Sequence, residues 1–189
     1  MIGLAPALLM TMTTGETRAA PIGFGPLSEV QAEQASAWNH RLLAAPNATM
    51  ELQRWCDERP GMPPGVKITA TVLPGSGPKL SATDRRRLGI GADDVIAYRH
   101  VRLECMGIML SEADNWYVPS RLTEDMRRQL AATRTPFGAV IQPLRPRRQN
   151  RLIKFDGGAI LFEHEGLVAA ADGRPLALVR ERYQRALIL

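Results

Sequence analysis

Two arginines in one predicted strand have the chemistry to hold a carboxylate. Arg99 and Arg102 lie in the segment 95–105, which is predicted to be a strand. The planar guanidinium group offers two parallel donors to a carboxylate and stays charged when it is partly buried. Because side chains alternate along a strand, the two arginines face opposite sides of the sheet. Three possibilities stay open: Arg99 enters a pocket, Arg102 enters it, or both are surface charges.

Glu181, in the last predicted strand, is the candidate for proton chemistry. A carboxyl group that faces an apolar pocket has a raised pKa, and it can exchange a proton with a ring hydroxyl or bond to it. The alternative is a surface glutamate that pairs with the neighbouring Arg180 or Arg182. The two interpretations differ in which face of the strand carries Glu181.

Met50 lies at the start of a predicted helix. Backbone N–H groups in a first helical turn lack helical partners, and the helix dipole favours anions there. The amide of Met50 is therefore a candidate ligand donor. The alternative is a core methionine on the apolar face of that helix.

The sequence shows no metal-ligand spacing. His40, His100 and His164 are isolated from one another, and Cys56 and Cys105 form neither a CxxC pair nor a zinc pattern. The two cysteines can form one disulfide in an exported protein, or be two small core residues in the cytosol. We expect neither a metal nor a cofactor.

The composition indicates one globular domain with a core of its own. The 189 residues are 45% hydrophobic and carry a formal charge of +5. Basic and acidic residues are interspersed except in a cluster around Arg145–Arg148, which is predicted to be a solvated loop. Aromatic residues make up 5% and are not interleaved with the basic ones, so no nucleic-acid partner is expected. No apolar run reaches the roughly 18 residues that a membrane span needs.

Residues 1–25 are expected to lie outside the domain, which we place at 26–189. The apolar stretch 2–10 and the small residues before Pro21 have some features of a signal segment. No positive charge precedes the stretch, and Pro21 is unsuited to the position after a cleavage site. An export signal and an unstructured extension both stay open, and so does the cellular compartment.

The periodicity of the remaining sequence predicts helices first and strands later. The predicted helices span 28–43, 49–59, a short segment from Ser81, and 124–132. The predicted strands span 66–73, 95–105, 109–118, 151–155, 159–170 and 175–189. This order is typical of an α+β fold in which helices pack against an antiparallel β-sheet.

Three motifs resemble one known family. These are DNWYVPSRLT at 114–123, TPFG at 135–138, and the ending Glu181-Arg182-Tyr183. They are similar to motifs of the chorismate pyruvate-lyases and of their relatives, the UTRA ligand-sensing domains of bacterial transcription regulators. The resemblance covers roughly residues 36–185 and implies a chorismate lyase-like fold. The segment Asp114–Trp116 departs from both groups.

The resemblance also assigns roles to individual residues. Counting back from the turn glycine Gly107 favours Arg99 over Arg102 as the carboxylate ligand. The resemblance further implies that Met50 and Phe137 contact the ligand through their backbone amides. Glu181 lies one residue further from the preceding turn glycine than in the family pattern. A bulge is therefore needed to keep Glu181 facing inward.

Two functions follow from the resemblance. The first is a lyase that converts chorismate to 4-hydroxybenzoate and pyruvate, a step of ubiquinone biosynthesis, with Arg99 and Glu181 as catalytic residues. That reaction needs no cofactor, and the enzyme would be a cytoplasmic monomer. The alternative is a non-catalytic domain that binds a small aromatic or carboxylated metabolite, as in the regulators.

Overall fold

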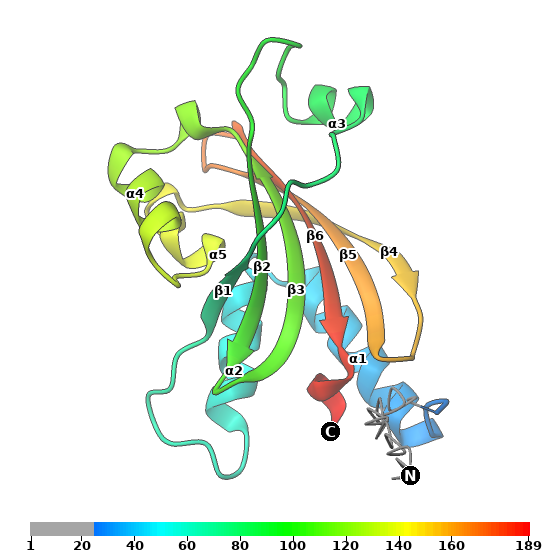
Figure 1. Ribbon diagram of the computed structural model, residues 1–189. Helices are drawn as coiled ribbons and strands as arrows, with labels where there is room; N and C mark the ends of the chain where they lie inside the picture. The colour runs from blue at the N-terminus through cyan, green and yellow to red at the C-terminus, as the bar shows by residue number, and fades with distance from the viewer. Residues whose placement is uncertain (1–24) are drawn as a thin grey trace, which may run out of the picture.

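The computed structural model describes residues 25–189, so the expectations for the segment before them lie outside the described residues. A six-stranded antiparallel sheet dominates this part of the chain, with the strand order β1-β2-β3-β6-β5-β4 (Figure 1). The strands are β1 (Thr69–Leu73), β2 (Ala97–Cys105), β3 (Ile108–Tyr117), β4 (Arg147–Phe155), β5 (Ile160–Ala169) and β6 (Pro175–Gln184). The predicted α+β class is confirmed.

Helices cover one face of the sheet more completely than the other (Figure 1). The α-helices are α1 (Glu29–Ala44), α2 (Ala48–Glu58), α3 (Ala82–Arg87), α4 (Glu124–Ala132) and α5 (Phe137–Val140). Short 3-10 turns are η1 (Pro119–Arg121), η2 (Gln142–Leu144) and η3 (Arg185–Ile188). We call the face that packs on α1, α2 and α5 the inner face, and the face that meets α3 the outer face.

The helix starts follow the capping signals in the sequence. Ser28 and Gln31 form a capping box at the start of α1, and Thr123 caps α4 by accepting a hydrogen bond from the Met126 amide. At the other end of α1, the side chain of Asn150 on β4 donates to the carbonyls of residues 42, 43 and 45. These carbonyls would otherwise lack partners, so the bonds fix α1 against the sheet.

The core lies between the inner face and α1 and α2. Its largest fully buried side chains include Tyr183, Phe162 and Leu52. Cys56 of α2 and Cys105 of β2 form a disulfide with a Cα–Cα distance of 6.0 Å. Of the two expected states of the cysteines, the structure therefore has the disulfide. The bond ties α2 to the sheet.

Several segments differ from the sequence prediction, among them the predicted strand 175–189, which ends at Gln184 and is followed by the 3-10 turn η3. Only Arg145 of the basic cluster lies in a loop, whereas Arg147 and Arg148 lie in a strand, because β4 begins at Arg147 and pairs with β5. The predicted strand 66–73 is shorter, since only Thr69–Leu73 pairs with β2. The short elements α5 and η2 were not predicted, because four residues or fewer show no helical periodicity.

None of the helices in residues 25–189 is long and apolar enough to cross a membrane. In the same part of the chain, no three His, Cys, Asp or Glu side chains are grouped so that they could hold a metal ion.

Candidate functional site

A small cavity of about 40 Å³ lies between the inner face of the sheet and the helices α2 and α5. Its apolar wall comes from side chains of β2, β3, β5 and β6, namely Val101, Leu103, Ala113, Val168 and Val179. Its polar groups come from both sides, namely Asn47, Thr49, Asn115, Arg148 and Glu181. The cavity therefore combines an apolar lining with a few convergent polar groups, which is the usual make-up of a ligand site.

A buried ion pair between Arg148 and Glu181 forms the charged part of the wall. The two side chains are 6% and 5% exposed, and the hydroxyl of Tyr183 donates to Glu181 Oε2 at 2.7 Å. Burial alone would raise the pKa of Glu181, but the charge and hydrogen bond of Arg148 and the Tyr183 hydroxyl lower it below its ordinary value. The expected raised pKa of Glu181 is therefore wrong, because the sequence did not reveal its partner.

Gly166 allows Arg148 to reach Glu181. Arg148 lies on β4 and Glu181 on β6, so the guanidinium crosses the intervening strand β5. A Cβ atom at Gly166 would overlap Arg148 Nε. Among the described residues this Nε has no hydrogen-bond partner. The absence of a side chain at Gly166 thus leaves room for Arg148 to cross β5.

The helix side of the cavity is closed by Asn47. Its Oδ1 accepts from the Thr49 amide at 2.9 Å as the N-cap of α2, and its Nδ2 donates to the Gly138 carbonyl of α5 at 3.2 Å. A Cβ atom at Gly138 would lie 2.7 Å from Asn47 Oδ1 and 2.9 Å from Thr49 Oγ1. The start of α2 and the start of α5 are therefore in close contact above the cavity.

A buried histidine lies beside the ion pair. His164 Nε2 lies 2.7 Å from Asn39 Oδ1 of α1, and its ring stacks on Phe162 at 5.0 Å between centroids. Burial lowers the pKa of His164 from 6.5 to about 4, an effect that Glu181 partly opposes. His164 is therefore neutral at pH 7 and adds no charge beside the Arg148–Glu181 pair.

Two of the predicted site residues line the cavity, and they are Phe137 and Glu181. Glu181 faces inward, and the β5–β6 register shifts between Val168 and Ala169, opposite the start of β6. This irregularity lies between the turn glycine Gly173 and Glu181, where the sequence required a bulge. Phe137 is buried, and its ring packs on Tyr117 at 5.6 Å.

The predicted arginines lie outside the cavity. Arg99 is buried on the same face of β2 as Val101, but its guanidinium donates to the carbonyls of Thr133 and Thr135 at 3.2 Å each. Burial lowers its pKa. Arg102 points to the outer face, where it lies 3.6 Å from Glu112. The structure thus places these arginines on opposite faces, and neither contributes to the cavity wall.

Met50 also lies outside the cavity. Its side chain is 57% exposed, and its amide donates to the Asn47 carbonyl at 3.2 Å. Both expectations for Met50 are therefore corrected: the amide already has a partner, and the side chain is not part of the core. Its neighbour Thr49 lines the cavity instead.

The sequence prediction missed Arg148, Asn47 and Asn115. Arg148 was assigned to a solvated loop because no acid is near it in sequence, whereas its partner Glu181 is 33 residues away. One signal was available, since Gly166 lies inside a predicted strand. An isolated glycine in a strand often marks the close approach of another group.

Comparison with solved structures shows the fold. PhnF from Mycobacterium smegmatis matches with a TM-score of 0.52 and 12% sequence identity, over 90% of this chain and 92% of that chain. The ligand-binding domain of a putative GntR-family transcriptional regulator from Bordetella bronchiseptica gives 16% identity and a TM-score of 0.48, over 67% of this chain and 86% of that one. The match to PhnF shows the fold, and the predicted fold class is confirmed.

Comparison with known sequences identifies a relative. No family model matches the chain. The uncharacterized protein y4mC of Sinorhizobium fredii is 36% identical to it, over 84% of this chain and 77% of the relative. At this identity and coverage, the chain belongs to the same protein family as y4mC.

Proposed function

We propose that residues 26–189 form one domain that binds a small polar metabolite, without catalysis, in the cavity between the sheet and the helices α2 and α5. The observation that carries the proposal is the buried Arg148–Glu181 pair in the cavity wall, in which Arg148 Nε has no hydrogen-bond partner within residues 25–189. Burying two charges is costly, and an unpaired buried donor adds to that cost. A ligand that accepts a hydrogen bond from Arg148 offsets part of this free-energy cost.

The polar groups indicate the chemistry of the ligand. Glu181 is ionised and can accept from a hydroxyl or amide of the ligand, while Arg148 Nε can donate to a neighbouring oxygen. On the opposite wall, Asn47 and Thr49 begin α2, a helix of 11 residues whose N-terminus favours negative charge. A hydroxylated aromatic acid fits this arrangement, with its hydroxyl at the ion pair and its carboxylate near Thr49.

The cavity must open to admit such a ligand. Its volume of about 40 Å³ holds a few water molecules at most, because one water needs roughly 10–15 Å³ of such space. The element that can move is α5, which has only four residues and is held to α2 by the bond from Asn47 to Gly138. Binding is therefore proposed to shift α5 away from α2.

Lyase activity is the weaker hypothesis. The reaction needs a group that manages a proton, whereas Arg148 keeps the pKa of Glu181 low. It also needs an arginine free to hold a carboxylate, whereas Arg99 is bound to two backbone carbonyls. These contacts favour binding over conversion of chorismate.

The test is calorimetric titration with 4-hydroxybenzoate and 3-hydroxybenzoate, with pyruvate assayed after incubation with chorismate. We expect binding of a hydroxybenzoate and no pyruvate. Thr49→Val should weaken binding about tenfold, because it removes one hydrogen bond to a carboxylate. Thr83→Val, on α3 at the other face, is the matched control and should leave binding unchanged. Steady release of pyruvate, or no effect of Thr49→Val on binding, contradicts the proposal.

A further inference from the structure

The outer face carries a second, larger depression that the proposed function does not use. It is a groove of about 620 Å³ between the loop 75–80 and the strands β2 and β3. Pockets for small molecules typically have volumes of roughly 300–1,000 Å³. The groove includes Trp116, from the segment in which the sequence departs from both lyases and regulators. Alternation along β2 and β3 places it on the opposite side of the sheet from the cavity.

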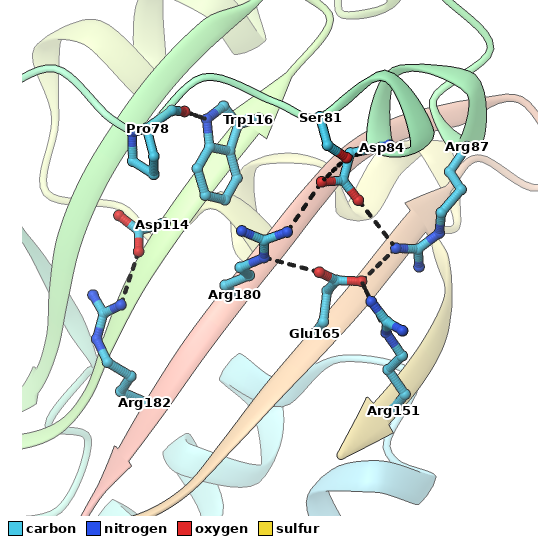
Figure 2. A network of polar contacts seen from close by, with 10 residues as sticks. All are labelled: Pro78, Ser81, Asp84, Arg87, Asp114, Trp116, Arg151, Glu165, Arg180 and Arg182. Carbon is cyan, nitrogen blue, oxygen red and sulfur yellow. Dashed lines mark hydrogen bonds and ion pairs between the residues drawn. The ribbon is translucent and has the colours of Figure 1, made fainter. Parts of the chain in front are cut away.

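The floor of the groove is aromatic. Tyr98 and Trp116 are directly opposite each other on β2 and β3, with ring centroids 5.5 Å apart. Trp116 Nε1 donates to the Pro78 carbonyl at 3.0 Å, and the Tyr98 hydroxyl donates to Asp114. Figure 2 shows Trp116 held by Pro78 on one side, with Arg180 below its ring. Trp116 is only 3% exposed and Tyr98 is partly buried, so the ring surface available for stacking is that of Tyr98.

The loop 75–80, which forms the wall of the groove, is in contact with the aromatic floor. A Cβ atom at Gly77 would overlap the ring of Tyr98. The backbone of the loop therefore lies directly against the ring of Tyr98. The hydrogen bond from Trp116 Nε1 to the Pro78 carbonyl holds the next residue of the loop. These two contacts hold the wall in place beside the open part of the floor.

Two cations line the groove without an acidic partner. Arg85 of α3 donates to the carbonyls of Gly91, Ala92 and Asp94, which are neutral groups. Lys79 lies in the loop beside it. Within residues 25–189, no carboxylate lies within 4.0 Å of the charged nitrogens of either side chain. Their positive charge is therefore available to a ligand.

Two acidic groups near the groove are already neutralised by other arginines, while the carboxylate of Asp94 accepts a hydrogen bond from the Gly91 amide. Figure 2 shows Asp84 bound to Arg87 and Arg180, and Asp114 bound to Arg182. These carboxylates do not need Lys79 or Arg85 as partners. The groove thus combines an aromatic floor with a positive rim, which selects against cations and in favour of flat anions.

We propose that the groove binds a planar aromatic ring that carries an anionic group, a carboxylate or a phosphate. The ring stacks on Tyr98 beside Trp116, and the anion lies between Lys79 and Arg85. This site is separate from the cavity of the proposed function and does not depend on it.

The test is NMR titration of the whole chain with 2-naphthoate, 2-naphthyl phosphate and the uncharged 2-naphthol. We expect at least one of the anions to shift the Trp116 indole N–H and the Gly77 amide, and to bind at least tenfold more tightly than 2-naphthol. The amide signals of Phe137 and Gly138 report on the cavity in the same spectra, so binding there is distinguished from binding in the groove.

Lys79→Gln is the first variant, because Lys79 makes no hydrogen bond or ion pair within residues 25–189 and its loss should leave folding intact. It should weaken anion binding at least threefold, and Arg85→Gln should add to the loss. Arg86→Gln, on the same helix but outside the groove, is the control. Shifts confined to the cavity, equal binding of 2-naphthol, or no effect of Lys79→Gln would overturn the proposal.

Discussion

On the inner face of the sheet a single arginine, Arg148, balances the buried Glu181, whereas on the outer face three arginines share the buried Glu165. Arg87, Arg151 and Arg180 reach Glu165 from α3, β4 and β6, and Figure 2 shows them converging on its two oxygens. These three side chains are 28%, 59% and 41% exposed, while Arg148 is almost fully buried.

The difference lies in redundancy and in access to water. When an outer arginine is lost, two others still neutralise Glu165, and water can solvate the gap. When Arg148 is lost, Glu181 has no second cation within the described part of the chain, and the helices keep water away. The inner face thus depends on one pair, and the outer face tolerates change.

The strongest test of this comparison is the loss of unfolding free energy caused by Arg148→Ala, set against the loss caused by Arg151→Ala. Removing one partner of a buried ion pair costs about 3–5 kcal/mol, so we expect a loss of that size for Arg148→Ala. Arg151 is half exposed and one of three partners, so Arg151→Ala should cost about 0–1 kcal/mol. Urea unfolding followed by circular dichroism measures both losses. Equal losses for the two variants would show that the faces do not differ in this way.

Gly166→Ala tests the inner pair without removing a charge. The added methyl group would overlap Arg148 Nε, so either the guanidinium or β5 must move. Overpacking of this kind costs about 1–3 kcal/mol. The matched control is Gly158→Ala, because a Cβ atom there meets nothing within 4 Å and Gly158 has no positive φ. A loss as small as that of Gly158→Ala would mean that Arg148 can shift freely.

The fold was predictable because its signals are local. The cap Ser28, the cap Thr123 and the turn glycine Gly107 each act within a few residues, and the elements they bound appear where the sequence placed them. The inward orientation of Glu181 was one of two interpretations left open by the sequence, and the resemblance favoured it on the condition of one bulge. Such features need no knowledge of what lies across the sheet.

The site was less predictable because its key contacts are between segments far apart in the sequence. Arg148 was taken for a solvated charge because its acidic partner is two strands away, across Gly166. Arg99 has the chemistry of a carboxylate ligand, but the loop 133–135 supplies carbonyls that occupy it. Which donor stays free depends on tertiary contacts, and residue type alone does not reveal them.

The pH dependence of the free energy of unfolding should also differ between the two faces, and this is the smallest of the expected effects. The pKa of His164 on the inner face falls from 6.5 to about 4, because burial disfavours its charged form. The unfolded chain therefore takes up a proton between those values that the folded chain does not, and stability falls as the pH drops from 6.5 to 4. On the outer face, burial alone would raise the pKa of Glu165, but three arginines lower it from 4.5 to about 2. The stabilisation that ionised Glu165 gives to the folded state is complete above pH 4.5 and is lost as the pH falls to about 2.

Melting temperatures of the wild type, His164→Gln and Glu165→Gln between pH 7.5 and 2 test this assignment. His164→Gln should flatten the curve only between pH 6.5 and 4, and Glu165→Gln only below 4.5. Added salt should reduce the Glu165 effect more than the His164 effect, because the arginines around Glu165 are partly exposed to solvent. If both variants flattened the same pH range, or if salt acted equally on the two, the inner face would be no better shielded from water than the outer one.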